Sequence, residues 1–522
     1  MATQPIVPEV ILEASLGNAI NDVAGTVIND VAGRPILDMG LTDILGETRT
    51  TAPISMREGI EGTGPLDRVG DVGEISFRLG NTGQDYSPDS ANVRDRFRNG
   101  PQIRHGLSHA GNASYKRAYI ASIDPDDGQY GPKGTHITAY DWLDKAAEDH
   151  PKRIPVQLGQ RDDQLIQTAL DNASRAPMAT SLAIGPDTYP YAFHNFQDEN
   201  AKMIGVMQAI AQSGMGYIIL RGNAIKGEEL VYQTRIDRLE EDTPVATLSD
   251  SMQSVNVIRN KDNRVRSVTV FATPTRVDAA ATTVLYEHTS EISLAPGQSK
   301  SFDAYYVDPT GQGARVAMVE PVQPVAGTDF EFSSTSGSGS DLNDDLGVTV
   351  VHGGNAARVT VKNNAGVQGF VQVGFQLRGK GVYIYDRESV TEVADGVNSG
   401  RELSFVMPYN DSLDRAGDIA QFILNQWSED FSTVEGVRFV ANRTEALMAA
   451  AINTVPGNLV HLEETQTGLD NDFYCNMRSW EIYAGGRFIP VEWAVTPAVS
   501  AQVWRLDSTV LSVLDSTTIP AP

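Results

Sequence analysis

Hydrophobic and polar residues alternate in short runs along the first third of the chain, as in strands with one buried face. Ile75, Phe77 and Leu79 illustrate this period of two. The same pattern, bounded by Gly, Pro and Asp, predicts strands at residues 54–57, 73–78, 102–105, 116–123 and 135–140. Residues 124–134 are predicted to form a loop, and a short helix near 142–148 closes the domain. We therefore expect a tail-tube-like β-domain over residues 36–150.

Helical spacing appears in the next segment, which predicts an α+β domain over residues 151–245. Asp162 and Asp163 are expected to supply an N-terminal cap and first-turn negative charge. The apolar positions that follow are Leu165, Ile166, Ala169 and Leu170. A second helix is predicted at 199–213, followed by a strand at 217–220 and its hairpin partner at 229–235.

A change to Gly, Ser, Thr and Val marks residues 292–377, where an inserted immunoglobulin-like β-sandwich is expected as a decoration domain. Residues 333–340 (SSTSGSGS) are predicted to be a flexible loop inside it. The flanking segments 246–291 and 378–500 are expected to form a second β-barrel-like domain. It contains a capped helix over 411–428, and only strands are predicted after that helix.

Both ends of the chain are predicted to lie outside these domains. Residues 1–35 are expected to form an N-terminal arm in which INDVAG occurs twice, at 20–25 and 28–33. The apolar residues of the repeat either dock on a neighbouring subunit or belong to a disordered terminus. The first ten residues lack the basic and apolar regions of a secretory signal. Residues 501–522 are expected to be a C-terminal tail.

Length and composition predict a soluble protein of three to five domains. The chain has 522 residues, and a single core stops growing at roughly 250–300. No stretch approaches the roughly 20 apolar residues of a membrane span. With 41 Lys plus Arg against 67 Asp plus Glu, the formal charge is −26, which argues against a nucleic-acid-binding surface. A net negative charge would also suit the lining of a channel through which DNA passes, because a negative surface repels phosphates.

Candidate chemistry is sparse, so we expect no enzyme, no cofactor and no metal. Phosphate-binding glycine loops and the GxSxG elbow are missing from the sequence. Gly106 interrupts the pair His105 and His109, which favours packing or solvated roles over a zinc site. Cys475, the single cysteine, is predicted to be a buried strand thiol.

Two acidic runs resemble calcium loops but depart from the pattern. The first contains Asp124, Asp126 and Asp127, with Pro125 intruding and Thr135 at the twelfth position. The second is Asp341, Asn343, Asp344 and Asp345, with His352 at the end. Each is predicted to be an ordinary turn, and the alternative for the second run is an ion bound in the inserted domain.

Three stretches of the sequence resemble phage minor tail proteins of the tail-hub or baseplate-hub type. The first resembles the family's opening domain through these pieces: ISMREG (54–59), GEISFRLGN (73–81), YSP (86–88), GPQIR (100–104), residues 118–124 and THITAYDW (135–142). The second, 197–235, is similar to its helix and hairpin. The third covers 413–442 and 454–498 and contains TQTGL and WAVTPA. Residues 292–377 and the duplicated arm have no counterpart in the pattern.

The resemblance implies a structural hub in the virion tail tip, made in the host cytoplasm. Such a protein forms a ring, expected to be a homotrimer, that joins the tail tube to the tip and lets DNA pass. Its implied partners are copies of itself, the distal tail or tail-tube protein, the tape-measure protein, and tip, fibre or receptor-binding proteins. Two alternatives stay open: a receptor- or carbohydrate-binding tail protein acting through 292–377, and a tail-associated cell-wall hydrolase.

Overall fold

The computed structural model describes residues 6–498 except 16–17, 20–36, 39–40, 95–96, 129, 195–200, 259–263, 312–315, 385–386, 395, 398 and 429–432. The INDVAG duplication and the predicted tail at 501–522 lie outside the described residues. The chain is mainly β, with several sheets and few helices, as the alternating pattern predicts. Two short strands, β2 (Asn18–Ala19) and β3 (Leu37–Asp38), pair with each other.

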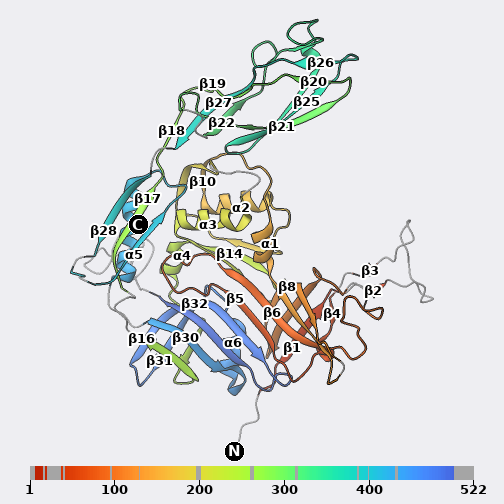
Figure 1. Ribbon diagram of the computed structural model, residues 1–522. Coiled ribbons are helices and arrows are strands. Elements are labelled where there is room, and N and C mark those ends of the chain that lie inside the picture. The colour runs from red at the N-terminus through yellow and green to blue at the C-terminus, as the bar shows by residue number, and fades with distance from the viewer. Residues whose placement is uncertain are drawn as a thin grey trace, which may run out of the picture.

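One sheet of thirteen strands forms the base of the molecule (Figure 1). Its strand order is β16-β30-β33-β32-β5-β6-β9-β8-β7-β1-β4, and β15 joins through β31 to β32. The strands are β1 (Glu9–Ala14), β4 (Thr42–Asp43), β5 (Ile54–Gly59), β6 (Asp71–Gly80), β7 (Gln102–His109), β8 (Asn112–Pro125), β9 (Gly134–Tyr140), β15 (Ala246–Ser249), β16 (Ser254–Ile258), β30 (Thr433–Val440), β31 (Leu459–Glu464), β32 (Leu469–Ile482) and β33 (Pro490–Pro497).

The early and late parts of the sequence meet in this sheet between β5 and β32. The two strands are antiparallel, with Met56 opposite Trp480 and Ile54 opposite Ile482. A single hydrophobic core lies behind both parts and includes Ile75, Phe77 and Leu79, as their alternation predicts. Parts of the two segments expected to form separate β-domains therefore share one sheet and one core.

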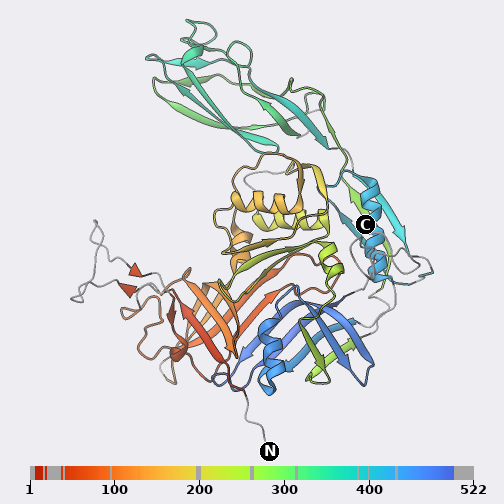
Figure 2. The ribbon, with the colours of Figure 1, turned by 180° about the vertical axis from the view of Figure 1, so that it is seen from behind.

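Helix α6 (Glu445–Asn453) packs on β7, β8 and β15, between the two halves of the sheet (Figure 2). The prediction of strands alone after residue 428 is wrong at this helix. Thr444 caps it by accepting a hydrogen bond from the backbone of Leu447. The short 3-10 turns η1 (Leu45–Glu47) and η4 (Ala441–Arg443) lie at the margins of the same sheet.

Strand β1 corrects part of the predicted N-terminal arm. Residues 9–14 pair along their whole length with β7, and Leu12 and Ala14 are buried in the core. The alternation of Val10, Leu12 and Ala14 explains why this segment joins the sheet rather than projecting from it.

An α+β block packs on the large sheet and forms its own core. Its helices are α1 (Trp142–Glu148), α2 (Asp162–Asp171), α3 (Met203–Gly214) and α4 (Arg235–Glu240). Its strands are β10 (Gln157–Arg161), β11 (Thr180–Leu182), β12 (Thr188–Ala192), β13 (Tyr217–Arg221) and β14 (Glu229–Gln233). Arg161 occupies the cap position of α2, so the capping role expected of Asp162 is wrong. The predicted hairpin strand also ends early, because Thr234 starts α4.

A three-stranded sheet stands beside this block. Its order is β28-β17-β29, formed by β17 (Val265–Ala272), β28 (Glu388–Val393) and β29 (Arg401–Val406). Helix α5 (Leu413–Trp427) begins at the cap residue Ser412, as predicted, and packs on β17 and β28. Its buried face and this sheet form a separate core that includes Ile419 and Val268.

A distal β unit lies at the opposite end of the molecule from the large sheet (Figure 1). Ten strands form three small sheets: β18 (Thr275–Val277), β19 (Thr283–His288), β20 (Ile292–Leu294), β21 (Ser299–Tyr305), β22 (Ala317–Val322), β23 (Phe332–Ser333), β24 (Leu346–His352), β25 (Ala356–Asn363), β26 (Gly369–Val371) and β27 (Phe375–Ile384). Strands β18 and β19 and the end of β27 extend this unit beyond the expected boundaries 292–377. Among the described residues, no helix is long and apolar enough to cross a bilayer.

Candidate functional site

Four charged side chains are buried where the large sheet meets the α+β block. Glu58 comes from β5, Lys116 from β8 and Arg478 from β32, while Asp141 precedes α1. Their side chains are 0–1% exposed. Two cations and two acidic groups therefore meet at a junction that solvent does not reach, and each cation has an oppositely charged partner, as buried charges require.

Arg478 links three parts of this junction. Its Nε and Nη2 donate to Glu58 Oε1 at 3.0 and 2.6 Å, and Nη2 also donates to the Ser114 hydroxyl at 2.9 Å. Its Nη1 donates to the carbonyls at the end of α6, including Thr454 at 2.9 Å and Ile452 at 3.2 Å. A cation at a helix C-terminus satisfies carbonyls that lack partners within the helix.

Lys116 connects the same junction to the α+β block. Its ammonium donates to Asp141 Oδ2 at 2.8 Å and lies 3.4 Å from Glu58 Oε2. Glu58 Oε2 also accepts a hydrogen bond from the backbone of Gly222 at 2.6 Å. Burial alone raises the pKa of Glu58, but Arg478 and Lys116 outweigh it and hold that pKa below its ordinary value. The junction thus clamps both halves of the sheet to the block above them.

A second buried carboxyl lies inside the α+β block. Asp162 fits between Gly185 and Gly214, where an added Cβ would approach its Oδ2 and Oδ1 to 2.9 and 2.6 Å. The Tyr189 hydroxyl donates to Asp162 Oδ1 at 2.7 Å. Burial raises the pKa of Asp162 to about 7 despite this bond. The Asp162 carboxyl therefore changes from its protonated to its ionised form near neutral pH.

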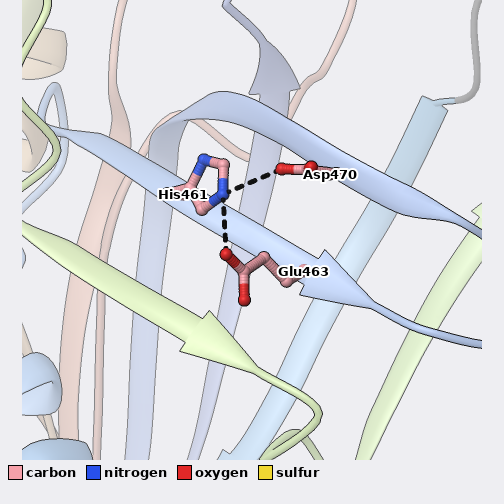
Figure 3. A group of neighbouring side chains, drawn as sticks. All are labelled: His461, Glu463 and Asp470. Carbon is pink, nitrogen blue, oxygen red and sulfur yellow. Dashed lines mark ion pairs between the residues drawn. The ribbon is translucent and has the colours of Figure 1, made fainter.

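An exposed hairpin carries the one group of three possible metal ligands found among the described residues: His461, Glu463 and Asp470 (Figure 3). His461 Nε2 lies 3.4 Å from Glu463 and 3.1 Å from Asp470, and Nδ1 lies 2.7 Å from Asp472. Burial lowers the pKa of His461, but the three carboxylates outweigh it and raise that pKa. Because the same Nε2 faces both acids, the arrangement favours an imidazolium ion-paired to carboxylates over a metal ligand.

His105 and His109 lie on β7 and do not come together at one site. His105 is fully buried, with Nδ1 2.8 Å from the Ile11 carbonyl, while Nε2 accepts from Trp480 Nε1 at 3.0 Å. These partners fix the proton on Nδ1. Burial lowers the pKa of His105 to about 4. His109 Nε2 instead lies 2.7 Å from Glu445 on α6, so the two rings pair with different elements.

The acidic runs occupy turns. Asp126 lies between β8 and β9 and accepts hydrogen bonds from Arg78 and the backbone of Gly134. In the second run, Asp341 accepts from the backbone of Asn343, whose own side chain accepts from the backbone of Phe332. Local donors thus engage these oxygens within the turns.

Cys475 is a buried thiol in β32, which confirms the prediction. Burial raises its pKa to about 12, so the reactive thiolate is suppressed at neutral pH.

The buried junction was not predicted from the sequence, although the sequence carries a signal for it. Glu58 has the same strand parity as the buried residues Ile54 and Met56, and Arg478 has the parity of Trp480 and Ile482. A charged residue on the apolar face of a strand needs a buried partner. Which residue supplies that partner depends on strand pairing.

Comparisons with known proteins give matches in structure alone. No family model matches the sequence, and a search of curated proteins finds no match. The 43 kDa tail protein of prophage MuSo2 from Shewanella oneidensis has a TM-score of 0.47 and 10% identity, covering 94% of this chain and 99% of that one. A tail protein from Neisseria meningitidis has a TM-score of 0.46 and 10% identity, covering 95% and 99%.

A more distant neighbour is a component of the type VI secretion system of E. coli, described as structurally similar to phage T4 tail proteins gp27 and gp5. Its TM-score is 0.37 and its identity 6%, covering 85% of this chain and 73% of that one. Two of these neighbours are described as tail proteins and the third as a component of a secretion system.

Proposed function

We propose that this protein is a structural tail-hub subunit of a bacteriophage tail tip or baseplate. Copies assemble into a ring, a homotrimer, which joins the tail tube to the tip and to host-recognition proteins and lets DNA pass. In this proposal the two halves of the large sheet serve as tube-like β-domains. The proposed neighbours are the distal tail or tail-tube protein, the tape-measure protein and tip or fibre proteins.

The observation that carries the proposal is the single thirteen-stranded open sheet. Segments 54–142 and 454–498, which hold much of the tail-hub resemblance, pair through β5 and β32. The strand order runs from β16 to β4 without returning to its start. An open sheet has edge strands with unpaired backbone groups, and a closed ring of subunits is one way to cover them by symmetry.

The outer face of this sheet supports a role as a wall for passing DNA. A hollow of about 860 Å³ lies over β5, β32 and β33. Charged residues of both signs line it: Arg57, Glu74, Arg438, Glu481 and Glu492. Such a face lacks the cationic surplus that would hold phosphates.

Native mass spectrometry and electron microscopy of the purified chain test the ring. We expect a particle with three times the mass of the 56.4 kDa chain and a central channel. A monomer at the concentrations at which tails assemble, with no ring in the virion map, would contradict the proposal.

The distal β unit supports a second candidate, adhesion to a receptor or carbohydrate. This unit has its own core and projects away from the large sheet (Figure 1). Its ends are adjacent, since Val277 pairs with Val382. Replacing residues 278–381 by Asn-Gly should therefore close a hairpin and leave the remainder folded. Loss of adsorption by particles that still assemble would favour adhesion, and unchanged adsorption would reject it.

A further inference from the structure

Three arginines surround a small cavity where the large sheet, the α+β block and α5 meet. Arg68 lies just before β6, and Arg235 and Arg238 lie on α4. Their exposed fractions are 3%, 4% and 6%. The cavity has a volume of about 30 Å³, and Tyr217 and Tyr474 also line it. The segment before β6 and helix α4 therefore bring three cations to one cavity.

Arg68 and Arg238 have only uncharged hydrogen-bond acceptors among the described residues. Arg68 donates from Nε to the Pro65 carbonyl at 2.8 Å and from Nη1 to the Met215 carbonyl at 3.0 Å. Arg238 donates from Nε to the Gln233 side chain and from Nη1 to Asn476 Oδ1, each at 3.2 Å. The Nη2 atoms of both residues are buried and have no partner in the described structure.

Arg235 shows how a buried guanidinium is normally compensated in this fold. Its Nη1 donates to Asp187 Oδ2 at 2.6 Å and to the Gly214 carbonyl at 2.9 Å. The ion pair outweighs burial and raises the pKa of Arg235. Burial instead lowers the pKa values of Arg68 and Arg238. Burying an ion without a paired counter-ion opposes folding, because the ion loses its hydration without gaining an opposite charge.

Aromatic rings contact these two guanidinium groups, which have no ion-pair partner among the described residues. Arg68 Cζ lies 4.3 Å and Arg238 Cζ 3.4 Å from the centre of the Tyr217 ring. Arg238 Cζ also lies 4.9 Å from the centre of the Tyr474 ring. Cation–π contact orients the groups but leaves their in-plane donors available. Asp67 acts electrostatically on Arg68 and Glu241 on Arg238, but neither carboxylate forms an ion pair with these arginines in the described part of the chain.

We propose that this cavity binds one carboxylate group, offered by an acidic side chain of an adjoining polypeptide. Its two oxygens accept from the unpartnered nitrogens of Arg68 and Arg238, so one anion compensates both cations. A carboxylate offers two oxygens for the two unpartnered nitrogens, whereas a tetrahedral phosphate is larger and has four. Binding there would clamp α4 to α5 and to the large sheet. The inference goes beyond the proposed function, because it requires no ring.

Saturation-transfer NMR on the full-length protein tests this site, with sodium acetate as the probe and ionic strength held constant with sodium chloride. Wild-type protein should bind acetate. Arg68→Met and Arg238→Met should each weaken binding at least about tenfold, because each removes one charge-assisted pair. The matched control Arg438→Met alters an arginine whose side chain is 62% exposed, and should bind acetate as wild type does. Undetectable acetate binding, or equal binding by all variants, would overturn the proposal.

Two further probes identify the source of the anion. A blocked Gly-Glu-Gly peptide should compete with acetate, and failure to compete would refute the polypeptide source. Inorganic phosphate should compete more weakly, and competition about tenfold stronger than that of acetate would refute the choice of carboxylate. If the arginine variants do not fold, a map of the wild-type protein in acetate decides the question. Density bridging Arg68 and Arg238 supports the site, and an empty cavity rejects it.

Discussion

Arg478 donates two hydrogen bonds, from Nε at 3.0 Å and from Nη2 at 2.6 Å, to one carboxylate oxygen of Glu58, although the two residues are 420 positions apart in the chain. Both side chains are inaccessible to solvent. The pair lies on neighbouring strands, β32 and β5, at the point where the two halves of the large sheet meet. Every part of the fold that touches this junction therefore depends on both ends of the chain being in place.

Arg478→Met should destabilise the protein strongly. The change leaves Glu58 buried with one cation fewer and deprives the end of α6 of its donor, and breaking a buried pair costs about 3–5 kcal/mol. Urea unfolding followed by tryptophan fluorescence measures this as a lower midpoint. Adding Glu58→Gln should recover part of the loss, because the uncompensated charge disappears. A midpoint that equals that of the exposed control Arg438→Met would contradict this account.

Asp162→Asn should stabilise the protein more at pH 8 than at pH 5. The folded pKa of Asp162 is raised to about 7 from 3.8, so the folded state holds a proton that the unfolded state releases between these values. Stability therefore falls as pH rises from about 4 to 7, at a total cost of about 4 kcal/mol. Asn keeps an acceptor for Tyr189 and does not ionise. Parallel pH profiles of wild type and variant would refute the assignment.

His105→Gln should reduce acid sensitivity. The folded pKa of His105 is about 4, below the ordinary 6.5, so protonation of the unfolded state lowers stability as pH falls from 6.5 towards 4. At pH 5 this amounts to about 2 kcal/mol. Glutamine offers an acceptor for Trp480 and a donor for the Ile11 carbonyl. Thermal midpoints at pH 7 and pH 5 measure the difference, which should be larger in wild type than in the variant.

His461→Asn should show the opposite pH dependence. The folded pKa of His461 is raised by Asp472, Asp470 and Glu463, so its stabilisation is complete below pH 6.5 and disappears as pH rises through the folded value. The variant should be less stable than wild type at pH 6 and equal to it at pH 9. Proton NMR of the imidazole gives the pKa directly. A measured pKa below 6.5 would contradict the ion-paired arrangement.

The residue pattern within a short segment was sufficient to predict helices and strands whose formation does not depend on which distant element they contact. Ser412 and the apolar spacing behind it predicted α5, and alternation predicted β6 with Phe77 on its buried face. The burial of Cys475 followed from its apolar neighbours. In contrast, α6 was not predicted, although Thr444 and an alanine-rich segment mark it. The helix has only nine residues and lies between segments with a strand-like pattern.

The sequence by itself determined a mainly β chain of several units, its strand faces and its resemblance to tail hubs, because these depend on the order of residues within short segments. Only the tertiary structure decided that β1 joins the sheet, that β5 pairs with β32, and that Glu58 meets Arg478. It also decided that Arg68 and Arg238 share a cavity. Strand pairing and buried charge compensation are contacts across long chain separations, and the period of a single strand carries no information about which distant strand it meets.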